Sequence, residues 1–133
     1  MSLQMAEDCL FCEIDREHLW LDNEVGIALW DAYPVSKGHA LVVPRRHVAS
    51  IYDLPGCDQH SLWELVAAAR KALLEKFSPN GFNIGINDGL VAGQTVMHAH
   101  IHVIPRYTGD VPDPRGGVRW VIPEAAAYWE GSS

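Results

Sequence analysis

Residues 93–106 read GQTVMHAHIHVIPR, and this segment determines the architecture that we expect for the whole chain. Three of the seven histidines occur here at strict two-residue spacing, as His98, His100 and His102. In a strand this spacing places all three on one face, whereas a helix would turn His100 nearly opposite to the other two. The β-branched residues nearby and the stop at Pro105 also favour a strand. The opposite face of that strand would carry Met97, Ala99, Ile101 and Val103.

The strand geometry limits what the three histidines can do together. Neighbouring imidazoles on one face stand roughly 6.5–7 Å apart, which is too far for a catalytic hydrogen bond but suits separate roles along an elongated substrate. One ion held by all three rings is disfavoured, because the outer rings are over ~13 Å apart and each ligand must approach within about 2 Å. A solvent-facing polar stripe is the simpler alternative, although three successive histidines are more than such a stripe requires.

Length and composition describe one ordinary globular domain spanning residues 1–133. The hydrophobic share is 48% and the charged share 20%, with no apolar run long enough to span a membrane and no signal segment, so we expect no membrane contact and a cytoplasmic location. The formal net charge of −7 disfavours a nucleic-acid partner, which would call for a basic patch. A small anionic ligand remains compatible with an acidic chain, because a local pocket can still be positive.

A C-x₂-C pair, Cys9 and Cys12, lies near the N-terminus. In a cytosolic chain such a pair indicates metal binding or redox chemistry before a disulfide. Zinc needs two further ligands, and two small buried hydrophobic residues are an equally good interpretation of the pair alone. His47, which follows two arginines, is by itself more typical of a surface residue than of a ligand.

The remaining pattern predicts short strands, one long helix and a hairpin. Asp58 to about Phe77 has helical periodicity, with Asp58 as the N-cap and a stop at residues 79–81. Asp31 ends a strand, and the local sequence favours a turn residue over a carboxylate that binds hydroxyl groups. The loop from Asp88 to Gly93 would close a hairpin beside the histidines, where its backbone N–H groups could hold phosphate oxygens. Strands are expected at 18–21, 25–30, 39–44, 82–87 and over the histidines, with a short helix at 123–129.

Taken together, these motifs resemble the histidine triad (HIT) superfamily of nucleotide hydrolases and transferases. The resemblance covers nearly the whole chain and rests on motifs in a fixed order: Leu10-Phe11, Asp31 with Pro34, Gly38-His39 through Pro44 and His47, Asn87-Asp88-Gly89, and Gly93-Gln94-Thr95 before the three histidines. It implies an α+β fold with a five-stranded antiparallel sheet and one long helix packed on it. It also implies a homodimer that joins two sheets.

The resemblance also implies roles for individual residues. His100 would attack the α-phosphate of a nucleotide and form a nucleotidyl-histidine, and a neutral imidazole is a competent nucleophile. His102 and Thr95 would hold phosphate oxygens, Gln94 would contact the leaving group, and Asn87 would orient the phosphate end. Asp31 would bind the ribose hydroxyls. The catalytic set is then His98, His100, His102 and Gln94, and the substrate contacts are Leu10, Phe11, Ile14, Leu29, Asp31, Asn87, Gly93 and Thr95.

Zinc-bearing members of the superfamily provide four ligands that correspond here to Cys9, Cys12, His47 and His98. Two thiolates and two imidazoles make a closed tetrahedral set, which is typical of a structural zinc site. Members without the cysteines are still active, so the expected Zn²⁺ would not perform the chemistry.

The function expected from the sequence is hydrolysis at the α-phosphate of a dinucleoside polyphosphate or a nucleoside phosphoramidate, with release of a nucleoside monophosphate. Two alternatives use the same scaffold: a non-catalytic, regulatory nucleotide-binding protein, and a nucleotidyl transferase or phosphorylase. A zinc-stabilised module that binds a protein is a further alternative. An intact His100 argues against pure binding, which needs no nucleophile.

Overall fold

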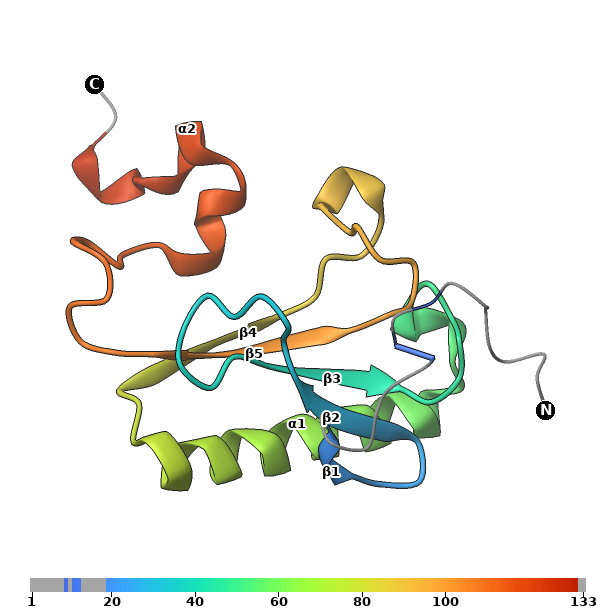
Figure 1. Cartoon of the computed structure of the whole chain (residues 1–133). Coiled ribbons are helices and arrows are strands. Elements are labelled where there is room, and N and C mark those ends of the chain that lie inside the picture. Colours follow the sequence, from blue (N-terminus) through green and yellow to red (C-terminus); the bar gives the residue numbers. More distant parts are fainter. Residues whose placement is uncertain (1–8, 10, 13–18, 132–133) are drawn as a thin grey trace.

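The computed structural model describes residues 9, 11–12 and 19–131, and it has the expected α+β architecture (Figure 1). Five antiparallel strands form one open sheet in the order β1-β2-β3-β5-β4. Their bounds are β1 Leu19–Asp22, β2 Gly26–Trp30, β3 Ala40–Pro44, β4 Gly81–Gly85 and β5 Ile101–Arg106. The predicted hairpin between the fourth strand and the histidine strand is confirmed by the antiparallel register of β4 and β5, in which Gly85 lies opposite His102.

The long helix α1 (Gly56–Phe77) covers one face of the sheet, as Figure 1 shows. The predicted helical periodicity is confirmed, since the buried residues recur at helical spacing: Leu62, Leu65, Val66, Ala69 and Leu73. The predicted N-cap is wrong: Pro55 is the cap residue, and Asp58 lies in the first turn, where a carboxylate still interacts favourably with the helix dipole. The helix ends at Phe77, and its C-cap residue Ser78 has a left-handed φ of 53°.

Alternation along the strands gives the sheet two different faces. Ala28, Ala40, Val42, Ile101 and Val103 point toward α1 and form the main core. The other face carries a smaller apolar cluster of Ile27, Leu29, Leu41 and Val43, against which Phe11 packs. The histidines lie on this second face, so the core holds the sheet from one side and leaves the other for a site.

The β4–β5 loop and the C-terminal segment both stand on the side of the sheet away from α1 (Figure 1). The loop contains a short 3-10 helix, η4 (Leu90–Ala92), and the C-terminal segment contains η5 (Gly117–Val121), α2 (Pro123–Ala126) and η6 (Tyr128–Glu130). The expected helix at 123–129 is therefore present, but it is broken into one α-helical and one 3-10 turn. No helix of the described chain is long and apolar enough to cross a membrane.

Candidate active site

The three histidines do not lie in one regular strand, which corrects the sequence-based prediction. β5 begins at Ile101, so His98 and His100 precede it. The backbone there is held by the loop after β3, because the Ala99 N–H donates to the Val48 carbonyl at 2.7 Å. Met97, which was expected on the core face, is 41% exposed. The irregular backbone allows His98 to turn toward a different group of ligands from the other two.

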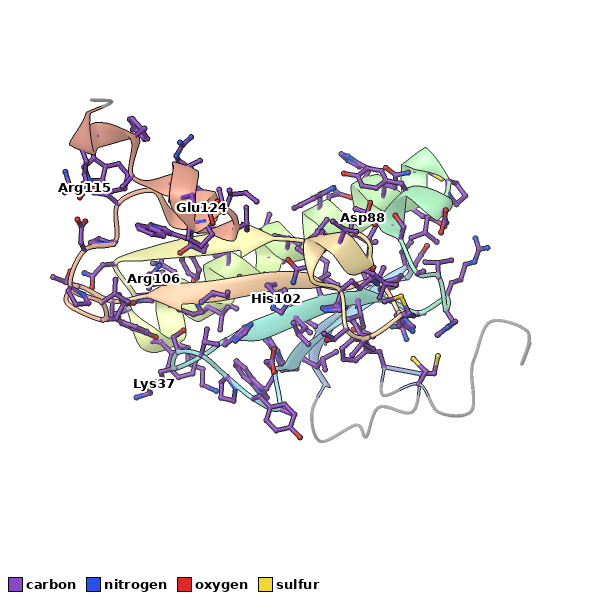
Figure 2. The ribbon with its side chains drawn as sticks, turned by 90° about the horizontal axis from the view of Figure 1, so that it is seen from above. Lys37, Asp88, His102, Arg106, Arg115 and Glu124 are labelled. Carbon is purple, nitrogen blue, oxygen red and sulfur yellow. The ribbon has the colours of Figure 1, made fainter. Side chains whose placement is uncertain are left out.

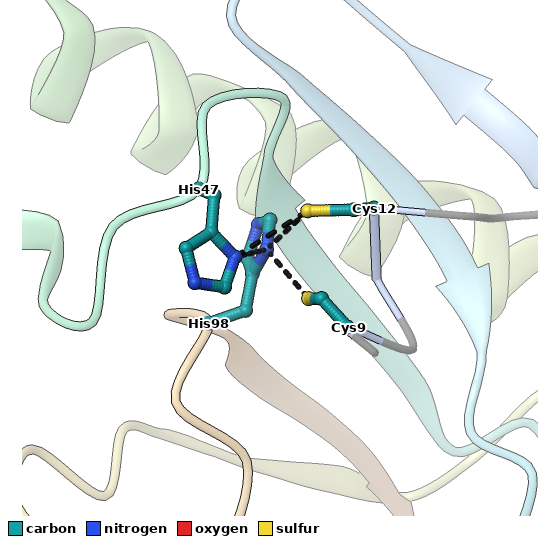
Figure 3. Close-up of side chains that lie close together, drawn as sticks. All are labelled: Cys9, Cys12, His47 and His98. Carbon is teal, nitrogen blue, oxygen red and sulfur yellow. Dashed lines mark hydrogen bonds between the residues drawn. The ribbon is translucent and has the colours of Figure 1, made fainter. Parts of the chain in front are cut away.

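His98 meets the two cysteines and His47 in one cluster (Figure 3). The His98 Nδ1 atom is 3.2 Å from Cys9 Sγ, 3.5 Å from Cys12 Sγ and 3.1 Å from His47 Nδ1. Four ligands around a tetrahedral zinc ion stand about 3.3–3.8 Å apart, given Zn–N and Zn–S distances of about 2.0 and 2.3 Å. The spacing and the donor set therefore both fit zinc. His47, which looks like a surface residue in the local sequence, is part of this cluster.

Ring hydrogen bonds indicate which nitrogen of His98 faces that cluster with a lone pair. The side chain is fully buried, and its Nε2 lies 2.8 Å from the Pro44 carbonyl. Because a carbonyl oxygen only accepts, Nε2 carries the proton and Nδ1 is free to ligate, which is the usual arrangement of a metal-bound histidine. Burial is the main cause that lowers the pKa of His98, which favours the neutral ring that a metal requires. Burial also raises the pKa of the Cys9 thiol, and a bound cation would reverse that effect.

A hydrogen bond to a backbone carbonyl also fixes the tautomer of His100. Its Nδ1 lies 2.8 Å from the His98 carbonyl, so Nδ1 carries the proton and Nε2 keeps its lone pair. No described residue forms a hydrogen bond with Nε2. The ring is 8% exposed and packs edge-on against the rings of Phe11 and His102, at centroid distances of 5.1 and 5.2 Å. This imidazole is outside the metal-type cluster and retains a nucleophilic nitrogen.

His102 lies on β5 between the loop that carries Asp88 and the Arg106 end of the strand (Figure 2). Its Nδ1 is 3.0 Å from His39 Nε2 and 4.0 Å from an Asp31 carboxylate oxygen. Burial, together with the charges that His100 and His39 would carry, lowers the pKa of His102 to about 4. The ring is therefore neutral at pH 7. Asp31 serves as a turn residue too, since its other oxygen accepts the Tyr33 N–H at 2.8 Å.

The loop before the histidines is tied together by Gln94, which is 4% exposed. Its Oε1 accepts the Gly89 N–H at 2.9 Å, and its Nε2 donates to the carbonyls of Ala49 and Val96 at 2.8 and 3.0 Å. In this structure the Gln94 amide thus orders the loop, and its contact with a leaving group stays a prediction. Thr95 is exposed beside it.

The other predicted substrate contacts lie around this face of the sheet. Asn87 is half-buried, and Gly93 (φ 98°) sits close enough that an added Cβ would stand 4.0 Å from the Asn87 Cγ. Phe11 and Leu29 share the smaller apolar cluster, whereas Leu10 and Ile14 fall outside the described residues. The roles of all these residues stay predictions.

One residue was missed as a functional candidate. His39 is 3% exposed and lies between Asp31 and His102, although the sequence reasoning treated it only as the start of a strand and part of a motif. A polar residue at the head of an otherwise apolar strand, HALVVP, is the signal that could have identified it.

The fold and the site together define a class of protein: an α+β domain in which a Cys₂His₂ cluster stands next to an imidazole with an available Nε2 lone pair. The chain belongs to the HIT domain family, whose model matches residues 13–109. It is 34% identical over 110 residues to Protein hit of Bacillus subtilis, covering 79% of this chain and 75% of that protein.

Two further relatives bear on the chemistry. An adenosine 5'-monophosphoramidase of Schizosaccharomyces pombe is 33% identical over 102 residues, covering 74% of each chain. The crystal structure of a Zn-bound histidine triad family protein from Mycobacterium smegmatis is 30% identical, with a TM-score of 0.70, and covers 92% of this chain and 96% of that one. The family thus includes nucleotide hydrolases.

Proposed function

We propose that this chain hydrolyses a nucleotide substrate at the α-phosphate, through a nucleotidyl-His100 intermediate, and releases a nucleoside monophosphate. The single observation that carries the proposal is the 2.8 Å hydrogen bond from His100 Nδ1 to the His98 carbonyl. It leaves the Nε2 lone pair for attack, and it would also stabilise the positive charge that the ring gains when Nε2 bonds to phosphorus. A purely binding site does not need such an arrangement.

The reaction would proceed in two displacements. His100 Nε2 attacks the α-phosphorus, and the bond to the leaving group breaks; the leaving group departs with the bonding electrons and takes a proton from solvent. Water then attacks phosphorus, the P–N bond breaks, and the released proton goes to solvent. Asp31 would hold the ribose, while His102, Thr95 and Asn87 would contact the phosphate.

The test is a substrate panel of diadenosine polyphosphates, adenosine phosphoramidates and nucleotide sugars, with release of the monophosphate measured for wild type and His100→Ala. We expect the variant to lose turnover by about a thousandfold or more, as nucleophile removal does in covalent catalysis, while calorimetry still detects nucleotide binding. His60→Ala, at an exposed position on α1, is the matched control. An unchanged rate in His100→Ala would end the proposal, and a wild type that binds nucleotide but releases nothing would favour the non-catalytic alternative.

We further propose that Cys9, Cys12, His47 and His98 hold a structural Zn²⁺. The four ligand atoms lie within 4.8 Å of one another, and this proximity, the Cys₂His₂ donor set and the Zn-bound relative support the assignment. A bound ion would keep both thiols deprotonated and would fix the ring of His98. The backbone carbonyl of the same residue orients the ring of His100. With four protein ligands the ion has no open position for substrate, so its part is to hold the N-terminal segment and the histidine segment together.

The expected homodimer also stays a proposal. β4 is an edge strand, and an edge presents unpaired backbone groups that a second copy can satisfy. Exposed apolar residues in the C-terminal segment, on the same side of the sheet as the site, add surface suited to burial: Val118, Trp120, Val121, Ile122 and Tyr128. Light scattering after size exclusion should give twice the 14.8 kDa chain mass. A monomer at micromolar concentration would contradict the proposal.

The cytoplasmic location stays a prediction of the sequence.

A further inference from the structure

Asp31, His39 and His102 form a second cluster of ligand-type groups on the catalytic face. His39 Nε2 lies 3.0 Å from His102 Nδ1 and 3.4 Å from Asp31 Oδ2, and the three ligand atoms are all within 4.8 Å of one another. Two histidines and one carboxylate are also the ligands of many iron and zinc sites. The cluster is therefore either a second metal site or a chain of hydrogen bonds.

The other ring nitrogen of His39 decides between these possibilities. Its Nδ1 lies 3.1 Å from the Val35 backbone nitrogen, and a backbone N–H can only donate. Nδ1 therefore holds a lone pair and Nε2 holds the proton, so Nε2 has no lone pair for a metal. A metal-bound histidine shows the reverse pattern, in which the second nitrogen donates, as His98 does toward the Pro44 carbonyl. The same criterion thus assigns one cluster to a metal and excludes this one.

The donor-to-acceptor direction of this chain of hydrogen bonds follows from the assignment. The Val35 N–H donates to His39 Nδ1, and the His39 Nε2–H donates to His102 Nδ1. His102 must then carry its own proton on Nε2, where no described residue is bonded to it. We infer that His39 is a positioning residue, which holds His102 as the Nε2–H tautomer so that its ring presents a fixed hydrogen-bond donor to a phosphate oxygen of the substrate. The phosphate contact rests on the proposed function, whereas the tautomer does not.

The surrounding structure keeps the first donor of the chain in place. The loop that carries Val35 is fixed to the end of β5, because the Ser36 hydroxyl donates to the Pro105 carbonyl at 2.6 Å and the Tyr107 hydroxyl donates to the Lys37 carbonyl at 2.6 Å. His39 itself is 3% exposed. Burial lowers its pKa, and this effect outweighs the opposing effect of Asp31, so His39 stays neutral as the chain requires.

Two substitutions separate the two hydrogen bonds of His39. In His39→Asn the amide oxygen can stand where Nδ1 was and accept from Val35, but nothing reaches His102. In His39→Gln the amide nitrogen can stand where Nε2 was and donate to His102 Nδ1. Both variants lose the packing of the imidazole ring, and thermal melting should show a similar loss of stability in the two. A difference between them in the His102 tautomer or in kcat therefore reports the hydrogen bond that is donated to His102.

The primary measurement is the ¹⁵N spectrum of the histidine side chains at pH 7 in substrate-free protein, which reports the protonated nitrogen of each ring directly. We expect His102 to be protonated on Nε2 in wild type and in His39→Gln, and the Nδ1–H form to appear in His39→Asn. In turnover, His39→Asn should lose about tenfold in kcat, the scale of one hydrogen bond, while His39→Gln stays within about threefold of wild type.

Three results would overturn the inference. The first is a His102 ring that is protonated on Nδ1 in wild type, and the second is an equal effect of the two variants on the His102 tautomer and on kcat. The third is a second equivalent of Zn²⁺ that binds to wild type in calorimetry with zinc chloride alone and does not bind to His39→Asn. Because the tautomer is read without substrate, it is decided even if the panel shows no turnover. Absence of turnover with the expected tautomers would instead count against the proposed function.

Discussion

Removing the proposed Zn²⁺ from the Cys₂His₂ cluster should strongly destabilise the fold. A ligand that binds only the folded state adds RT ln(1 + [L]/Kd), which is about 4 kcal/mol when free zinc is a thousandfold above Kd. For a chain of 133 residues, an unfolding entropy of about 2.1 cal/mol/K per residue gives about 0.3 kcal/mol per kelvin. Chelation should therefore lower the melting temperature by roughly 15 °C.

The structure provides a matched control for this experiment. Cys12→Ser removes one ligand of the cluster, whereas Cys57→Ser removes an exposed thiol in the first turn of α1. Calorimetric melting of metal-loaded protein, with and without a chelator, should show the 15 °C difference in wild type and in Cys57→Ser but not in Cys12→Ser. Elemental analysis should give one zinc per chain in the first two proteins. A melting temperature that does not respond to the chelator, with less than a tenth of an equivalent of zinc bound, would refute the assignment.

Two further predictions concern the sheet and its histidines. Gly26→Ala should lower the free energy of unfolding by about 1–3 kcal/mol in urea titrations, because the new Cβ would lie 2.6 Å from Leu62 Cδ2 and 2.9 Å from the Val43 carbonyl oxygen. Gly81→Ala is the control and should be near neutral, because its new Cβ would have no atom within 4 Å. Equal losses of stability in the two variants would contradict the packing argument. The pKa of His102 is about 4 in the folded chain and about 6.5 when unfolded, so the unfolded state binds more protons between these values. The free energy of unfolding should therefore fall as the pH drops from 7 to 4.5, by up to about 3 kcal/mol from this ring. His102→Gln should reduce that fall, and an identical pH dependence in wild type and variant would be evidence against a buried neutral ring.

The strands and the long helix could be predicted from local sequence, whereas the five-stranded antiparallel sheet was implied by the family resemblance. Alternation and periodicity identified all five strands and the long helix, because a sheet face and a helix stripe must each bury their apolar residues in the same core. The boundaries failed where a tertiary contact decides them. The strand was predicted to begin at the first histidine, but the Ala99–Val48 hydrogen bond and the turn of His98 toward the cysteines hold the first part of the segment out of the ladder.

The site was predictable only as far as motifs extend. Cys9 and Cys12 were recognisable as a pair, but only the family resemblance added His47 and His98. The contacts that join the four residues cross 35 residues or more, and the local sequence around His47 is typical of a surface residue. Ring tautomers cannot be read from sequence at all, because they depend on which carbonyl or N–H faces each nitrogen. That is why His39 was overlooked: its significance lies in the Val35 amide on one side and His102 on the other.

The central claim is that His100 Nε2 forms a bond to the α-phosphorus of the substrate. The most direct test mixes the protein with an adenosine phosphoramidate, quenches the reaction in alkali, where a P–N bond survives, and maps the modified peptide by mass spectrometry. We predict one nucleotidyl group, on His100, that forms and decays at the rate of turnover and does not form in His100→Ala. Turnover without any adduct, or an adduct on His102, would contradict the claim.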